Sequence, residues 1–305
     1  MIATVVGDLR WDASLSGAAA GVALASAVEG PDALQRWRVR EALWRAGYPY
    51  PVYSAAFWTT EFNAPPPADL ITWVSQRDER DDLGVVRARG AEQDHWVVLA
   101  ARPRVSLDAL PRTLPEGGTL VLPPNPGFTW AAGDPDGAVT TGPLGGGARV
   151  PMATGGEWLL QIRDPAGVAA SALVYVDMPL PEERLLEPGT AATPGDAVMH
   201  QIERIRDLWE LPMLDTDPLL EAAAKGWQDD PERDPNGLTV GLGFEGTPVS
   251  WRCSAASVPD CLDQVVWEPA TRAAFIDPEH TSIGLAITTG NRIAITGFIG
   301  TPLSP

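Results

Sequence analysis

A turn near the end of the chain gathers residue types that could bind a metal ion or move a proton. Asp277, Glu279 and His280 follow a helical segment and precede an apolar run. An imidazole and a carboxylate can hold a divalent cation, and a second carboxylate can activate a water bound to it. The other histidines, His95 and His200, are distant in sequence. His280 is therefore either a turn residue at the entry of a strand or a ligand in a site that the fold completes.

Other reactive patterns are incomplete. The sequence has no Gly-x-Ser-x-Gly elbow, which excludes that form of serine nucleophile. The stretch GLGFEG resembles a phosphate-binding loop but lacks the Lys-Ser/Thr pair that follows such loops. The stretch DPDGAVTTG begins like a calcium-binding loop without completing one, so we interpret it as a hairpin turn.

The only two cysteines, Cys253 and Cys261, stand close together in RCSAASVPDC. Their spacing in a turn-rich segment favours a local disulfide, and disulfides persist mainly outside the cytosol. Two reduced cysteines in a core are the alternative interpretation.

Composition limits the partners. The 22 basic and 40 acidic residues give a formal charge of −18, which repels nucleic acid. No apolar run approaches the roughly 20 residues of a membrane span, so we expect no transmembrane segment. The N-terminus lacks a basic region and predicts no signal peptide, which fits a cytosolic protein or a form that starts after its leader. The 12 tryptophans either pack in cores or form a binding surface.

Element patterns divide the chain into three parts. The first part reads as two helices, a short helix and a hairpin around Gly90. Short β-type runs separated by glycine and proline fill residues 106–178 and predict an all-β sandwich. A linker at 180–196 follows, and then come two helices, a loop, one helix over 257–276 and a hairpin at Gly290.

The two ends of the chain share a pattern. Asp12 and Leu15 in LRWDASLSGAAA match Asp217 and Leu220 in LDTDPLLEAAA at an offset of 205. Leu83-Gly84-Val85 matches Ile283-Gly284-Leu285 at an offset of 200. Two matches in order at similar offsets indicate an internal repeat, and two unrelated segments with similar bland patterns are the alternative.

These segments carry a family resemblance. IERIRDLWELPMLDTDPLLEAAAKGW, DCLDQVVWEPATRAAFIDP and HTSIGLAITTG resemble the bacterial CAP superfamily of cysteine-rich secretory, antigen 5 and pathogenesis-related 1 proteins. LRWDASLSGAAA, REALWRAGYPYP and LGVVRARG resemble a more divergent copy. The resemblance implies an α/β/α sandwich at each end of the chain and leaves the β-rich centre outside the family.

The site that this family implies is altered here. Members with a metal-binding or catalytic cleft place two histidines and two acidic residues in it, one histidine within a Ser-x-x-His-Arg motif. This chain has Thr271 at that histidine position, followed by Arg272. A threonine hydroxyl is a poor zinc ligand. The candidate cleft residues are therefore Thr271, Arg272, Glu279 and His280, and we expect no catalytic residue, bound metal or cofactor.

We predict an α+β protein with CAP-like α/β/α sandwich domains at 1–104 and 195–305 and an all-β sandwich domain at 105–180. The expected function is a non-catalytic extracytoplasmic binding or scaffold protein, with a hydrophobic small molecule or another protein as partner. The alternative is a secreted metal-dependent hydrolase with a rearranged cleft around Asp277, Glu279 and His280.

Overall fold

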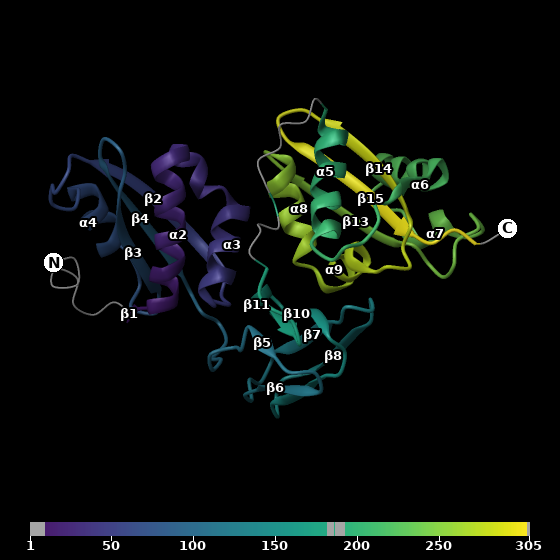
Figure 1. Cartoon of the computed structure of the whole chain (residues 1–305), viewed down its shortest axis with the longest axis horizontal. Coiled ribbons are helices and arrows are strands. Elements are labelled where there is room, and N and C mark those ends of the chain that lie inside the picture. The colour runs from purple at the N-terminus through teal and green to yellow at the C-terminus, as the bar shows by residue number, and fades with distance from the viewer. Residues whose placement is uncertain (1–9, 182–185, 187–192, 304–305) are drawn as a thin grey trace.

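The computed structural model describes residues 10–181, 186 and 193–303. Its helices and sheets form an α+β fold of three units, each built around its own sheet (Figure 1). We call them the N-terminal unit (10–101), the middle unit (113–176) and the C-terminal unit (194–300). The first nine residues and most of the predicted linker at 180–196 lie outside the described residues.

The N-terminal unit is a four-stranded sheet with helices on both faces. Its strand order is β1-β3-β4-β2. Every residue of β4 is buried, as expected for a central strand covered on two sides. Alternate β4 side chains face α2 on one side and α4 on the other. The elements are β1 (Arg10–Trp11), α2 (Ala13–Glu29), η1 (Gly30–Leu34), α3 (Arg36–Ala46), β2 (Val52–Thr60), α4 (Ala68–Ser75), β3 (Asp82–Arg89) and β4 (Asp94–Ala101).

The C-terminal unit has the same strand order in its own numbering, β12-β14-β15-β13. Helix α6 packs on one face of this sheet, while α5, α8 and α9 pack on the other. Its elements are α5 (Pro194–Asp207), β12 (Asp215–Thr216), α6 (Pro218–Asp229), α7 (Pro235–Thr239), β13 (Val249–Ala255), α8 (Val258–Val266), α9 (Pro269–Ile276), β14 (Ser282–Thr289) and β15 (Ile293–Gly300).

The residues matched between the two ends of the chain occupy equivalent places. Asp12 and Asp217 are the N-caps of α2 and α6; Asp12 accepts the backbone N–H of Leu15, and Asp217 accepts those of Leu219 and Leu220. The backbone of Leu15 lies so close to Gly84 that a Cβ atom at position 84 would overlap it. The backbone of Leu220 lies similarly close to Gly284. In each unit, glycine therefore allows the helix to approach the second strand of the sheet.

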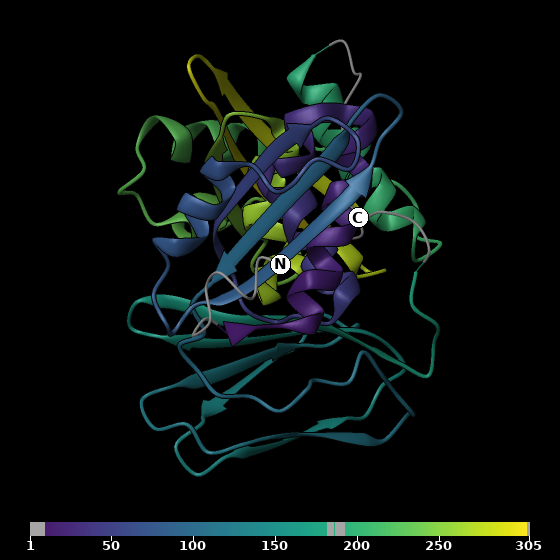
Figure 2. The same ribbon diagram turned by 90° about the vertical axis from the view of Figure 1, so that its left-hand side faces the viewer.

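The middle unit contains only strands among its described residues. A five-stranded sheet in the order β5-β11-β10-β7-β8 and the β6–β9 pair share one hydrophobic core, and in Figure 2 these strands lie below both helical units. The strands are β5 (Thr113–Leu114), β6 (Gly118–Leu122), β7 (Thr129–Gly133), β8 (Val139–Pro143), β9 (Ala148–Met152), β10 (Gly156–Asp164) and β11 (Gly167–Val176).

A shared hydrophobic cluster joins the three units. Trp37 and Trp44 of α3 and Tyr175 of β11 belong to the same buried cluster as the core side chains of α5, α8 and α9. Helix α3 packs against α8, and α9 packs on the middle sheet (Figure 1). Because the cluster removes apolar area from water at every junction, it stabilises one relative placement of the units.

The structure corrects three sequence predictions. The helix predicted over 257–276 is two helices, because Pro269 disfavours a helical backbone at Glu268, which has φ −99° and ψ 122°. The predicted loop after α6 contains the short helix α7, capped by Asp234. Strands β2 and β13 were not predicted, since neither shows a clear alternation of apolar and polar residues. No helix among the described residues is long and apolar enough to cross a membrane.

Candidate functional site

Helix α9 directs Arg272 away from the turn at 277–280 and into the junction with the middle unit. The Arg272 Nε lies 2.5 Å from Glu157 Oε1, and the Tyr175 hydroxyl donates to Glu157 Oε2 at 2.9 Å. The Arg272 and Glu157 side chains are 2% and 0% exposed. Burial is the largest single effect on the pKa of Arg272 and lowers it, but the charge and hydrogen bond of Glu157, together with Tyr175, raise the pKa above its ordinary value. The pair therefore joins two units as buried ions.

Thr271 is also buried, at 4% exposure. It lies on α9, whose residues other than Ala270 are buried. The structure thus places the Thr271 hydroxyl in a packed helix rather than at an open surface.

His280 and Glu279 lie in the turn before β14, and protein groups lie near both ring nitrogens of His280. His280 Nδ1 lies 3.2 Å from the Thr301 hydroxyl, and Nε2 lies 3.8 Å from Asp277 Oδ2. The Glu279 side chain is exposed, and its carbonyl accepts the Thr301 hydroxyl at 2.7 Å. Burial lowers the pKa of His280 despite the opposing effect of Asp277. The imidazole is therefore mostly neutral at pH 7.

Arg206 stabilises this turn through hydrogen bonds to backbone carbonyl groups. Its buried guanidinium donates to the carbonyl oxygens of Pro212, Phe275, Asp277 and His280 at 2.6 to 3.2 Å. These bonds satisfy carbonyls at the end of α9, where no further helical turn is present. The contacts explain the turn as a structural element.

The structure does not bring the candidate residues into one cluster. Arg272 contacts the middle unit, whereas His280 contacts Thr301 and Asp277. His95 is buried in β4 and His200 is exposed on α5. Within the described part of the chain, no group of three His, Cys, Asp or Glu side chains is arranged to hold a metal ion.

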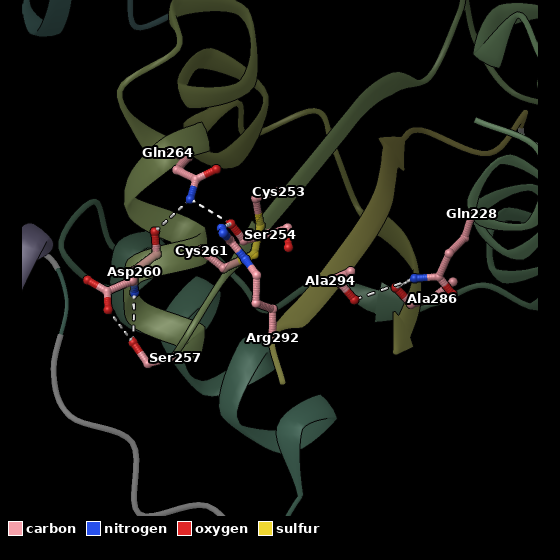
Figure 3. The surroundings of a disulfide bond; sticks show 10 residues. All are labelled: Gln228, Cys253, Ser254, Ser257, Asp260, Cys261, Gln264, Ala286, Arg292 and Ala294. Carbon is pink, nitrogen blue, oxygen red and sulfur yellow. Dashed lines mark hydrogen bonds between the residues drawn. A yellow bond between two sulfur atoms is a disulfide. The ribbon is translucent and has the colours of Figure 1, made fainter. Parts of the chain in front are cut away.

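The predicted disulfide is confirmed. Cys253 of β13 and Cys261 of α8 are bonded, with a Cα–Cα distance of 5.2 Å (Figure 3). The carbonyl of Ser254 accepts Gln264 Nε2 at 3.1 Å and also a guanidinium N–H of Arg292. The bridge and these bonds attach α8 to the edge strand of the C-terminal sheet.

A cavity of about 740 Å³ lies where the three units meet. We call it the inter-unit cleft. Its walls are α3, the segment 48–55 that leads into β2, parts of β10 and β11, and the end of α8 with its junction to α9. Ligand pockets in proteins are commonly about 300–1,000 Å³, so this volume suits a small molecule.

One wall of the cleft is charged. Arg36 and Arg40 of α3 each place Nε 3.4 Å from the same oxygen, Oδ2 of Asp263. Asp263 is 1% exposed, and burial raises its pKa against the lowering effect of the two arginines. Across the cleft, Arg163 pairs with Glu268 at 3.0 Å. The guanidinium of Arg40 also lies 5.6 Å from the ring centroid of Trp267.

The opposite wall carries tyrosines whose hydroxyls are bound within the protein. Tyr48 donates to Asp82 at 2.9 Å, and Tyr53 donates to Asp81 at 2.7 Å. Tyr50 accepts the backbone N–H of Leu107 at 3.2 Å. Burial raises the pKa of all three tyrosines, so they are neutral at pH 7. The hydroxyl bonds fix the rings in place as a preformed wall.

The cleft was not predicted from the sequence. Its walls come from three separate parts of the chain, within 34–55, 161–171 and 264–268, and no local motif indicates that they meet. Two weak signals were present: the Tyr-Pro run GYPYPVY and two arginines one helical turn apart in RWRVR. Neither signal shows on its own which surface it faces.

No family model and no curated protein sequence matches this chain. Among solved structures, an outer surface protein from Borrelia burgdorferi is similar over 36% of this chain and 92% of its own, with 17% identity and a TM-score of 0.32. A cysteine-rich secretory protein from Staphylococcus aureus is similar over 48% of this chain, with 12% identity and a TM-score of 0.29.

An extracellular protein from Bacillus anthracis that contains an SCP domain is similar over 47% of this chain, with 17% identity and a TM-score of 0.26. The similarity spans 56% of the length of each of the last two proteins. These neighbours include a protein that contains an SCP domain and a cysteine-rich secretory protein.

Proposed function

We propose that this chain is a non-catalytic binding protein that works outside the cytoplasm, and that the inter-unit cleft is its binding site. The observation that carries the proposal is the cleft itself. All three units contribute to its walls, and its volume of about 740 Å³ suits a small ligand with an apolar part. A scaffold that binds another protein through this surface is the second form of the same function.

The proposed architecture is two divergent CAP-like domains, at 1–104 and 195–305, that flank a β-sandwich domain at 105–180. The equal strand order of the two outer sheets supports it. The equivalent helix caps at Asp12 and Asp217 and the equivalent close approaches at Gly84 and Gly284 support it further. Such paired details are expected of a duplicated unit.

Two observations support a binding role over catalysis in the C-terminal unit. Thr271 stands buried at the position where the family resemblance implies a histidine. His280 has protein groups near both ring nitrogens. The disulfide between Cys253 and Cys261 supports an extracytoplasmic location, because such bonds persist mainly in oxidising compartments.

Filling the cleft tests the proposal. Nile red, a neutral apolar dye, is expected to bind with increased fluorescence, and Ser171→Trp, which places a large side chain at the cleft wall, is expected to weaken that binding. Ser75→Trp on the exposed surface of α4 is the matched control and is expected to leave binding unchanged. If Ser171→Trp leaves the affinity for Nile red unchanged, or if the dye does not bind at all, the proposal that the cleft binds apolar ligands is wrong.

A metal-dependent hydrolase is the alternative function. The 3.8 Å approach of His280 Nε2 to Asp277 Oδ2 is the observation that favours it. Metal analysis of protein purified without chelators distinguishes the two functions. Stoichiometric zinc that is lost on His280→Ala would establish the alternative.

A further inference from the structure

Arg36 and Arg40 stand one turn apart on α3, on the wall of the inter-unit cleft. Like charges at this spacing repel, so the pair needs negative charge nearby. The only ion-pair partner found for either guanidinium in the described chain is Asp263, and both Nε atoms approach the same oxygen of it. Two positive charges therefore share one carboxylate.

The contacts with Asp263 use only part of the hydrogen-bonding capacity of the two guanidinium groups. Nε is one corner of the guanidinium, and the terminal nitrogens form the fork that binds carboxylates and phosphates in pairs of parallel bonds. Arg40 uses one terminal nitrogen on the Asp263 carbonyl, at 3.4 Å. The Arg36 side chain is 61% exposed. Asp263 thus contacts each arginine mainly through Nε and leaves most of the terminal guanidinium nitrogens available to a ligand.

The charge of the cleft differs from that of the protein. Three arginines and one glutamate line it, and Glu268 is already paired with Arg163. The chain as a whole carries −18. Burial lowers the pKa of Arg40 more than Asp263 raises it, which agrees with incomplete compensation of its charge. A cationic cleft on an acidic protein attracts anions selectively.

The rest of the cleft suits an apolar or aromatic body. Trp267 lies beneath the Arg40 guanidinium, and Tyr50 and Tyr53 contribute rings whose hydroxyls are bound within the protein. Tyr50 and Tyr53 offer ring surfaces for stacking, whereas Trp267, at 4% exposure, is the buried support of the Arg40 guanidinium. One ligand could therefore use both kinds of contact.

We propose that the inter-unit cleft binds an amphiphilic organic anion, whose carboxylate or phosphate lies between Arg36 and Arg40 and whose apolar body packs against Tyr50 and Tyr53. This assignment rests on the proposed function and specifies the ligand class for that same site. Asp263 is the internal counter-ion that positions the two arginines while the site is empty.

Calorimetric titration with three related probes tests the assignment: phenylacetate, phenyl phosphate and the neutral phenylacetamide. At least one anion is expected to bind about tenfold more tightly than the amide, because charge-assisted hydrogen bonds are stronger than neutral ones. The tighter anion identifies a carboxylate or a phosphate as the preferred group. Raising the salt concentration is expected to weaken the binding of the anions and to leave the affinity for the amide unchanged.

Variants locate the anion. Arg36→Gln and Arg40→Gln are each expected to reduce anion affinity about tenfold without changing amide affinity. Arg233→Gln, in an exposed loop outside the cleft, is the matched control. Asp263→Asn is expected to tighten anion binding, since it removes the competing carboxylate. Arg36 is largely exposed, so its variant folds even where the buried positions prove sensitive.

Each outcome decides between the two proposals. Equal affinity for amide and anions, still reduced by Ser171→Trp, would overturn the anion assignment and preserve the binding function. Anion binding that is unaffected by both arginine variants would also overturn the assignment. Failure of all three probes and of Nile red would overturn the proposed function as well.

Discussion

Replacing Arg272 by methionine tests how the C-terminal unit is joined to the middle unit. The Arg272 side chain is 2% exposed and faces Glu157, which is fully buried. Methionine keeps much of the aliphatic length and removes the charge. Of the partners found for the Glu157 carboxylate within the described part of the chain, only the Tyr175 hydroxyl would then remain.

The expected cost follows from this burial. Removing one member of a buried ion pair leaves an uncompensated charge and typically costs about 3–5 kcal/mol. The second variant, Arg272→Met combined with Glu157→Gln, leaves no buried charge and keeps an amide oxygen to accept from Tyr175. It is therefore expected to be more stable than the single variant, by about 2 kcal/mol or more.

Urea unfolding followed by tryptophan fluorescence measures both values, because tryptophans lie in the shared cluster at the junction. Arg163→Met is the matched control. Arg163 and Glu268 also connect the middle unit with the C-terminal unit, but their side chains are 41% and 40% exposed. An exposed pair contributes about 0–1 kcal/mol, so the control is expected to have little effect.

Two results would refute this reasoning. A loss below about 1 kcal/mol for Arg272→Met would mean that water reaches the pair in solution. A double variant no more stable than the single one would show that packing, rather than the unpaired charge, causes the loss.

Three further predictions concern the outer units. Gly84→Ala and Gly284→Ala are each expected to cost about 1–3 kcal/mol, because the new methyl group would overlap a helix backbone, whereas Gly145→Ala has open space and serves as the control in thermal unfolding. Replacing both cysteines by serine is expected to cost about 2–3 kcal/mol by relaxing a short closed loop, and unchanged urea midpoints would contradict this. His280 has a lowered pKa in the folded protein, so the unfolded state binds this proton more readily and the free energy of unfolding falls as pH drops below about 6.5. His280→Gln is expected to flatten that part of the stability profile. An NMR titration that gives His280 a pKa above about 6.5 would contradict the predicted direction.

The sequence predicted the elements that are bounded by capping or turn residues of their own. Helix α2 begins after the cap Asp12 and ends at Gly30, and both residue types commonly cap helices. The β3–β4 hairpin turns at Gly90, as predicted. Strands β2 and β13 carry no such marks, because their side chains meet different surroundings on each face and their apolar pattern is blurred. Helix boundaries depend on nearby residues, whereas strand pairing depends on residues far away.

The candidate site divides in the same way. The sequence by itself determined which chemistry the turn at 277–280 could offer, the proximity of Cys253 and Cys261, and the threonine at position 271. Only the tertiary structure decided that Arg272 pairs with Glu157 and that Arg36 and Arg40 share Asp263. These partners are separated by more than 100 residues, so their meeting depends on how three hydrophobic surfaces pack, and no local pattern contains that information.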